Sequence, residues 1–273
     1  MKATLKLAIQ EKVLLQIFKK NHSITFFDIG SCEGLSSIRY LEILTNATSY
    51  AFEPVPSNFE KILKNKDKFQ ATNLHAYCLG LSSQKGTATF YLSSGKPPNK
   101  EVPTDQSSDF GNKSSSLYKP GKTKEIHPWL EFNETISIET ETLENFCKDH
   151  EIKTIDFIHM DVQGAELIVL EGAENIISNI NSIWLEVEKV PLYENQALKP
   201  QIETFLLSNN FICVINKVNN IAGDQFWIKK SFFDSLDNNT KLQLQFICYK
   251  SNLKSAFSSF FGHIKQKIKK LKA

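Results

Sequence analysis

Four carboxylate side chains each stand at or near the end of a segment that we predict to be a buried strand. They are Asp28, Glu53, Asp161 and Glu186. The strands of a parallel sheet all end at one edge, so these acids should converge there. Each acid alone could cap a helix or pair with a basic residue. Four together are costly to bury without a partner, which predicts a polar ligand that crosses this edge.

Glu53 lies about twenty residues beyond a glycine-bearing turn, Gly30-Ser31-Cys32-Glu33-Gly34, and an acid at this spacing can accept hydrogen bonds from both hydroxyls of a ribose. The turn is not G-x-G-x-x-G, and Glu33 would bring a negative charge close to a pyrophosphate. A cofactor with a ribose and no phosphate fits better, which indicates S-adenosylmethionine. We expect Asp28 and the backbone of the turn to hold its amino-acid end.

A methyl group on a sulfonium is already activated, so its transfer to a hydroxyl needs positioning and removal of a proton. We expect Asp161 to stand beside this methyl group and to orient or deprotonate the acceptor. Glu166, His159 and Glu186 are further candidates, although His159 could be a core histidine and Glu166 could complement its helix N-terminus. Acids here could hold Mg²⁺ around a diol, but no ligand spacing demands it, and we predict no metal site.

The segments that position these residues alternate between strands and helices. Predicted strands cover 25–29, 49–52, 73–77, 87–92, 154–160, 182–187, 211–215 and 225–228. Predicted helices cover 35–41, 58–64, 140–147, 165–172 and 201–208. We place 87–92 beside 73–77. This alternation predicts an α/β domain with a parallel sheet and helices on both of its faces.

Three regions fall outside this alternation. Residues 1–21 are predicted to form a helix on the edge of the domain, which itself covers 22–230. Residues 93–134 are rich in Ser, Lys, Pro, Gly and Asn and are predicted to be a flap over the active site. Residues 231–273 form a basic tail, in which Phe257, Phe260, Phe261, Ile264, Ile268 and Leu271 recur at the spacing of an amphipathic helix. That helix could dock on the domain or lie on an anionic membrane.

Composition narrows the class of protein. The formal net charge of +2 over 273 residues does not favour a nucleic-acid-binding protein. Five scattered cysteines without a C-x-x-C pair disfavour both a disulfide framework and a zinc site. No segment has the apolar length of a signal peptide core or a membrane span. We therefore expect a cytoplasmic protein, with peripheral membrane contact through the tail as the alternative.

The motifs resemble those of the FkbM family of methyltransferases over roughly residues 22 to 230. The matching stretches are Phe27-Asp28-Ile29-Gly30-Ser31-Cys32-Glu33-Gly34, Ala51-Phe52-Glu53-Pro54, Ser115-Ser116-Leu117, Met160-Asp161-Val162-Gln163-Gly164-Ala165-Glu166-Leu167 and Trp184-Leu185-Glu186-Val187. The resemblance implies a Rossmann-like class I fold with a mostly parallel seven-stranded sheet. It also implies S-adenosylmethionine as the cofactor, with Pro54 beside Glu53 at its site, and methylation of hydroxyl oxygens in sugars, glycans or secondary metabolites.

Two positions depart from the family pattern. The first turn commonly reads G-A-N-x-G, whereas this chain has Ser31 and Cys32, and the later motif commonly has Glu where this chain has Gln163. Two other functions remain as alternatives. An NAD-dependent dehydrogenase or epimerase would share the architecture but usually carries G-x-G-x-x-G and a Tyr-x-x-x-Lys pair. A non-catalytic protein could keep the fold and bind a membrane or partner through the tail.

Overall fold

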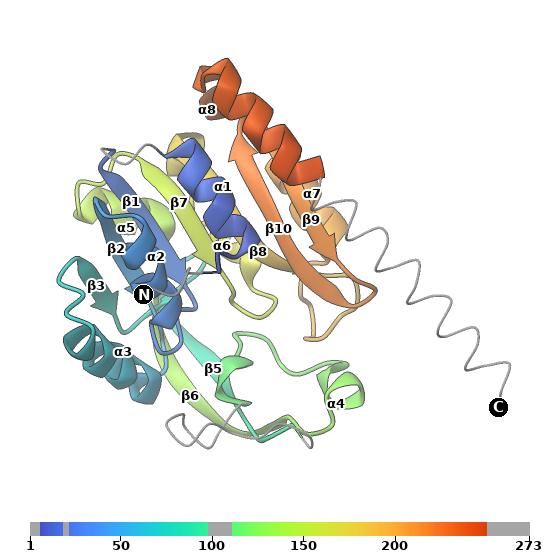
Figure 1. The fold of residues 1–273 in the computed structure, drawn as a ribbon. Coiled ribbons are helices and arrows are strands. Elements are labelled where there is room, and N and C mark those ends of the chain that lie inside the picture. The colour runs from blue at the N-terminus through green and yellow to red at the C-terminus, as the bar shows by residue number, and fades with distance from the viewer. Residues whose placement is uncertain (1–5, 19–21, 98–110, 250–273) are drawn as a thin grey trace, which may run out of the picture.

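The computed structural model describes residues 6–18, 22–97 and 111–249. Its main sheet has seven strands in the order β3-β2-β1-β7-β8-β10-β9 (Figure 1). The strands are β1 (Ile24–Ile29), β2 (Ala47–Phe52), β3 (Leu74–Tyr77), β7 (Ile155–Met160), β8 (Ile180–Glu188), β9 (Phe211–Val218) and β10 (Ala222–Lys229). Neighbouring strands are parallel except at β10, which is antiparallel to both β8 and β9. This confirms the predicted mostly parallel seven-stranded sheet.

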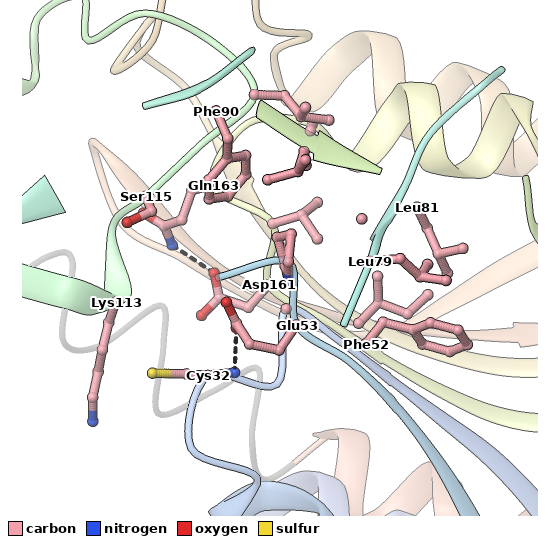
Figure 2. A pocket seen from close by; sticks show the side chains of 18 of the residues that line it. Cys32, Phe52, Glu53, Leu79, Leu81, Phe90, Lys113, Ser115, Asp161 and Gln163 are labelled. Carbon is pink, nitrogen blue, oxygen red and sulfur yellow. Dashed lines mark hydrogen bonds between the residues drawn. The ribbon is translucent and has the colours of Figure 1, made fainter. Parts of the chain in front are cut away.

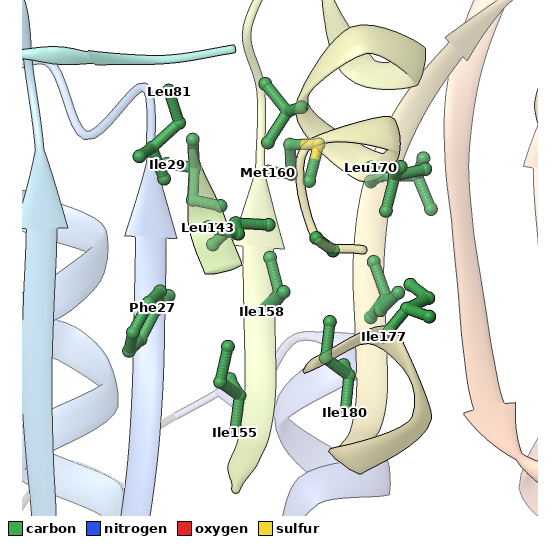
Figure 3. Packing of buried hydrophobic residues seen from close by; sticks show 14 of the residues in the cluster. Phe27, Ile29, Leu81, Leu143, Ile155, Ile158, Met160, Leu170, Ile177 and Ile180 are labelled. Carbon is green, nitrogen blue, oxygen red and sulfur yellow. The ribbon is translucent and has the colours of Figure 1, made fainter. Parts of the chain in front are cut away.

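Side chains alternate between the two faces of each strand, and the apolar ones build a separate core on each face. The first core lies under α5 (Leu143–Asp149), α6 (Glu166–Glu171) and α7 (Lys199–Ser208). Phe27, Ile158 and Ile183 belong to it (Figure 3). The 3-10 helix η2 (Ile176–Asn179) closes this layer next to α5.

The opposite face of the sheet is covered by α1 (Ile9–Ile17) and α2 (Leu35–Ile43), and α3 (Pro56–Lys68) packs beside α2. Val13 and Leu14 of α1 are fully buried there against Phe157 and Phe226. Asp28 and His159 have the same strand parity as Phe26 and Phe157, so their side chains lie on this second face. The face of the sheet that α1 and α2 cover therefore also carries buried polar groups near the carboxyl ends of the strands.

A smaller sheet lies across the carboxyl ends of the main strands (Figure 1). Its order is β4-β6-β5, formed by β4 (Gly80–Leu81), β5 (Gly86–Ser94) and β6 (Glu131–Glu141). The prediction that 87–92 lies beside 73–77 is wrong, since β5 pairs with β6 and not with β3. Strand β6 has mostly polar residues and was not predicted. The helix predicted from Thr140 begins at Leu143, because Thr142 caps it by accepting the N–H of Asn145 at 3.1 Å.

Between the two long strands of the smaller sheet, the described residues form η1 (Gly111–Lys113) and α4 (Thr123–Ile126). At the C-terminus, α8 (Lys230–Ser235) is followed by helical residues from 238 to 249. The amphipathic stretch from Phe257 to Leu271 lies outside the described residues. Within the described parts of the chain, no helix has the length and apolar character needed to cross a membrane.

Candidate active site

The glycine-bearing turn after β1 is a tight bend that presses against the end of β7. Gly30 has φ 80°, and a Cβ at this position would stand 2.0 Å from the carbonyl oxygen of Asp161. Only glycine fits there. Cys32 also adopts a left-handed conformation, with φ 51°, although it has a side chain. The bend is therefore made without the second glycine that such turns commonly use, at some cost in backbone strain.

Hydrogen bonds to the carboxylate of Glu53 offset part of this backbone strain. Its Oε2 accepts the backbone N–H of Cys32 at 2.8 Å, and its Oε1 accepts the N–H of Val55 at 2.9 Å. The carboxylate is thereby fixed between the turn and the start of α3, and the residue is only 5% exposed. Burial raises the pKa of Glu53 to about 7, against the lowering effect of these hydrogen bonds. Each oxygen of an ionised carboxylate can accept more than one hydrogen bond, so Glu53 can still serve a ligand.

A cavity opens directly beside Glu53 (Figure 2). Its floor comes from strand ends of the main sheet, and its roof from the smaller sheet. Apolar side chains form one wall: Leu79, Leu81, Phe90, Leu117 and Ile138. An apolar slot next to an anchored carboxylate suits a flat heterocycle joined to a ribose. The residues present thus fit the adenosine half of S-adenosylmethionine.

The predicted cofactor residues separate into two groups. Gly30, Glu53, Pro54 and Asp161 line the cavity. Asp28, Ser31, Glu33 and Gly34 do not line it. Ser31 is buried with its hydroxyl on the carbonyl of Phe52, Gly34 caps α2, and Glu33 forms an ion pair with Lys61 at 3.1 Å. The charge of Glu33 is thereby turned towards α3.

The motif after β7 is held together by the amide of Gln163. Its Nε2 donates to Asp161 Oδ1 at 2.5 Å (Figure 2). The same nitrogen donates to Glu186 Oε2 at 3.3 Å, and Gln163 Oε1 accepts the hydroxyl of Tyr193 at 2.9 Å. The backbone carbonyl of Gln163 accepts the hydroxyl of Ser116, which joins the roof to the motif. A neutral amide therefore holds two carboxylates side by side, at the position where a glutamate is common in the family.

Glu166 supports this motif from below. It is fully buried, and its Oε1 accepts the backbone N–H groups of Val162 and Gly164 at 3.1 and 3.4 Å. Burial raises the pKa of Glu166 to about 7. Because the side chain has no exposed surface, it shapes the loop and does not reach a substrate in this conformation.

Asp161 and Glu186 belong to a larger group of acids, which we call the acid row: Asp161, Glu186, Glu188 and Asp224. Glu186 and Asp224 are direct partners in the β8–β10 register. Burial and mutual repulsion raise the pKa of Glu186 to about 8 and that of Glu188 to about 10. The pKa values of Asp161 and Asp224 are raised from the same causes. Sequence reasoning missed Glu188 and Asp224, although the Glu-Val-Glu alternation at 186–188 places both glutamates on one face.

His159 lies on the same face as the acid row, two residues before Asp161. Its Nδ1 is 2.8 Å from Asp28 Oδ1, so the predicted cofactor ligand Asp28 is the partner of a predicted catalytic residue. The aromatic ring of Tyr40 packs edge-on against the imidazole at 5.5 Å. Within residues 6–18, 22–97 and 111–249, no group of three or more His, Cys, Asp or Glu side chains could hold a metal ion.

Comparison with known proteins agrees with this geometry. A family model described as the methyltransferase FkbM domain matches residues 28–213. The chain is 28% identical over 195 residues to the 2-O-methyltransferase NoeI of Sinorhizobium fredii, covering 71% of this chain and 75% of that protein. It is 22% identical over 178 residues to the hexuronic acid methyltransferase AglP of Haloferax volcanii, covering 65% and 62%.

Among solved structures, TrmK of M. capricolum in complex with S-adenosyl-homocysteine aligns with a TM-score of 0.43 and 12% identity, covering 93% of this chain and 99% of that one. The family model spans most of the chain and includes the glycine turn, Glu53 and the motif around Asp161. The chain therefore belongs to the FkbM family of S-adenosylmethionine-dependent methyltransferases.

Proposed function

We propose that this enzyme transfers the methyl group of S-adenosylmethionine to a hydroxyl oxygen of a sugar, glycan or secondary metabolite, with a glycan hydroxyl as the first choice. The observation that carries the proposal is the position of Asp161, which lines the cavity beside Glu53 and also begins the acid row. Carboxylates are strong acceptors for hydroxyl groups, so an acceptor rich in hydroxyls would be held next to the cofactor. The names of NoeI and AglP support an oxygen or sugar acceptor.

In this proposal each end of the cofactor has its own protein partners. Glu53 accepts hydrogen bonds from the ribose, and the apolar wall of Leu79, Leu81 and Phe90 packs on the adenine. The Gly30 turn and Asp161 face the amino-acid end. When bound, the cofactor supplies an electrophilic methyl group on a sulfonium. The remaining requirement on the protein is to orient the acceptor oxygen and to take its proton.

The two alternatives fit the site less well. A dinucleotide would bring its pyrophosphate to a turn that lacks the G-x-G-x-x-G pattern and carries Glu33. A non-catalytic protein would have no reason to keep a buried glutamate with a raised pKa anchored at the rim of a cavity. Titration calorimetry with S-adenosylmethionine and with NAD separates these cases, since we expect micromolar binding of S-adenosylmethionine only.

The direct test is a methyl-transfer assay on the full chain with labelled S-adenosylmethionine. Candidate acceptors are free sugars, nucleotide sugars and lipid-linked glycans, and the position of the new O-methyl group is read by mass spectrometry and NMR. Label on a sugar oxygen is the expected result. Cofactor binding with label only on nitrogen or carbon acceptors would contradict the hydroxyl assignment, and no cofactor binding would contradict the whole proposal.

We propose separately that the lysine-rich tail brings the enzyme to an anionic membrane surface, where glycans attached to lipids are assembled. The support is the sequence after Asp237, which has no acidic residue and many lysines. Co-sedimentation with vesicles containing phosphatidylglycerol tests it, using the full chain and a chain that ends at Ser255. Equal pelleting of the two chains would remove the proposal.

A further inference from the structure

A chain of buried hydrogen bonds runs from the middle of the main sheet to the imidazole of His159. The Ser49 hydroxyl donates to the Ser37 hydroxyl at 3.1 Å, and the Ser37 hydroxyl donates to Asp28 Oδ2 at 2.6 Å. The other carboxylate oxygen, Asp28 Oδ1, faces His159 Nδ1 at 2.8 Å. Ser49, Ser37 and Asp28 are at most 1% exposed. None of these four residues lines the cavity beside Glu53.

This chain of hydrogen bonds fixes the tautomer and the orientation of the His159 imidazole. An ionised carboxylate can only accept hydrogen bonds, so Asp28 Oδ1 accepts from Nδ1 of His159, which then carries the proton. In the neutral imidazole the opposite nitrogen, Nε2, is left with a free lone pair and points away from Asp28. The edge-on ring of Tyr40 limits rotation of the imidazole. The histidine is therefore held as a proton acceptor with one defined orientation, which is the arrangement of an acid-oriented catalytic base.

His159 is also the member of this hydrogen-bond chain that reaches solvent. Its side chain is 19% exposed, whereas that of Asp28 is 1% exposed. Asp161 follows Met160, the last residue of β7, and stands two residues after His159 in the chain. Asp161 and Asp224 are both close enough to act on its pKa. The imidazole thus borders the acid row that we propose to hold the acceptor.

The acids that could compete for the role of base are less suitable. Glu166 has no exposed surface. Asp161 and Glu186 share the amide of Gln163, so part of their capacity to accept protons is already used. Burial and repulsion raise the pKa of Glu186 to about 8, so near neutral pH it already carries a proton.

We propose that His159 is the general base that deprotonates the acceptor hydroxyl, and that Asp28 is the residue that positions it. This inference rests on the proposed O-methyl transfer and names the group that takes the proton. The O–H bond of the acceptor breaks, and its proton goes to Nε2. The acceptor oxygen forms the new bond to the methyl carbon, while the electron pair of the broken C–S bond stays on sulfur. The imidazolium then releases its proton to solvent.

The pH dependence follows from the charged groups that surround the imidazole. Asp28 on β1, Asp161 after β7 and Asp224 on β10 stabilise the imidazolium and raise the pKa of His159 against the opposing effect of burial. From the helix layer, Tyr40 of α2 contributes its ring, and Glu11 of α1 is paired with Arg39. A base must be unprotonated to act, so kcat/KM should rise with pH through the pKa of His159 and then level off.

The first experiment compares three variants of the full chain: His159→Gln, Asp28→Asn and the control His75→Gln on the exposed edge strand β3. We expect His159→Gln to reduce kcat by roughly 10²- to 10³-fold with S-adenosylmethionine binding preserved. We expect Asp28→Asn to lower kcat and to move the midpoint of the pH profile to lower pH, because the carboxylate that favours the imidazolium is gone. His75→Gln should retain wild-type activity.

A second readout does not depend on activity. NMR titration of the histidine ring protons gives the pKa of His159 directly, and it should fall in Asp28→Asn. Free imidazole should restore part of the activity of His159→Gly if the variant keeps its fold. An unchanged pH profile in both variants, with the cofactor still bound, would overturn the inference but leave the proposed function intact. A wild-type chain that does not bind S-adenosylmethionine would overturn the proposed function itself.

Discussion

The two halves of the carboxyl edge hold their polar groups in different ways. On the β1–β2 half the acid that lines the cavity is Glu53, and backbone N–H groups of adjacent turns anchor it. On the β7–β8–β10 half there are four acids, the acid row, and a single side-chain amide from Gln163 holds two of them. The first half presents one acid to the cavity, whereas the second half is crowded with acids whose pKa values are raised.

This difference separates binding from chemistry. A cofactor that is the same in every turnover can be met by a side chain that backbone groups hold in place, as Glu53 is held. An acceptor that differs between relatives is met by side chains, which can be exchanged one at a time. The predictions below test whether the two halves can be disturbed separately.

The largest effect is expected at Glu53. Replacement by Ala removes the carboxylate that we propose to bind the ribose and leaves two backbone N–H groups without their acceptor, so S-adenosylmethionine affinity should fall by about 10²-fold. Titration calorimetry measures it. The matched control is Glu33→Gln, since Glu33 faces Lys61 and lies outside the cavity. If both variants lost binding equally, the assignment of the cofactor to this cavity would be wrong.

The substitution Gln163→Glu should impair catalysis through the β7–β8–β10 half of the carboxyl edge. The change removes the donor to Asp161 and Glu186 and adds a further carboxylate to the acid row, which costs the site a charge-assisted hydrogen bond and introduces repulsion. We expect kcat/KM for methyl transfer to fall by roughly tenfold or more, with a smaller effect on cofactor affinity than in Glu53→Ala. Gln84→Glu, at an exposed position, is the control. Full activity of Gln163→Glu would show that the acid row tolerates another charge.

The buried acids of the row, together with Glu166, should also make the stability of the protein depend on pH. The pKa values of about 7, 8 and 10 for Glu166, Glu186 and Glu188 all lie above the ordinary value of 4.5. The folded protein therefore keeps protons that the unfolded chain has lost, and its stability should fall as pH rises from about 4.5 towards these values. Glu188→Gln should unfold a few degrees higher than wild type at about pH 9, with a smaller difference at about pH 6.

Thermal unfolding followed by circular dichroism measures this effect. The exposed substitution Glu60→Gln serves as the control for the loss of one glutamate. If the difference in unfolding temperature between Glu188→Gln and wild type stayed the same at every pH, the pKa of Glu188 would not be raised by its surroundings.

The smallest effect is expected where the roof meets the motif. Ser116 is fully buried, and its hydroxyl donates to the carbonyl of Gln163 while accepting the N–H of Tyr118. Ser116→Ala should reduce the free energy of unfolding by about 1 to 2 kcal/mol, because one buried acceptor and one buried donor lose their partner. Denaturant titration measures it against Ser208→Ala on the exposed side of α7. Equal stability of the two variants would mean that the roof is held elsewhere.

The same contrast explains what could be predicted from the sequence. Glu53 and Gly30 could be placed beside the cavity because their positions depend on local spacing along one β-α-β unit. Glu188 and Asp224 were missed because their roles depend on the register between β8 and an antiparallel strand that follows much later in the chain. Strand β6 was missed because its mostly polar residues show little apolar alternation. Asp28 was placed at the right edge of the sheet, but its partnership with His159 is a contact between residues 131 positions apart.

The place of β10 in the sheet has a consequence for how this enzyme is made. Strand β9 is synthesised before β10, but it reaches the sheet only through β10, which pairs with β8 on its other side. A nascent chain that has not yet released residues 222–229 from the ribosome can already contain the glycine turn, Glu53 and the motif around Asp161, but it cannot contain Asp224. In the proposed assignment, such a chain has the residues for the methyl donor before it has all of the residues for the acceptor.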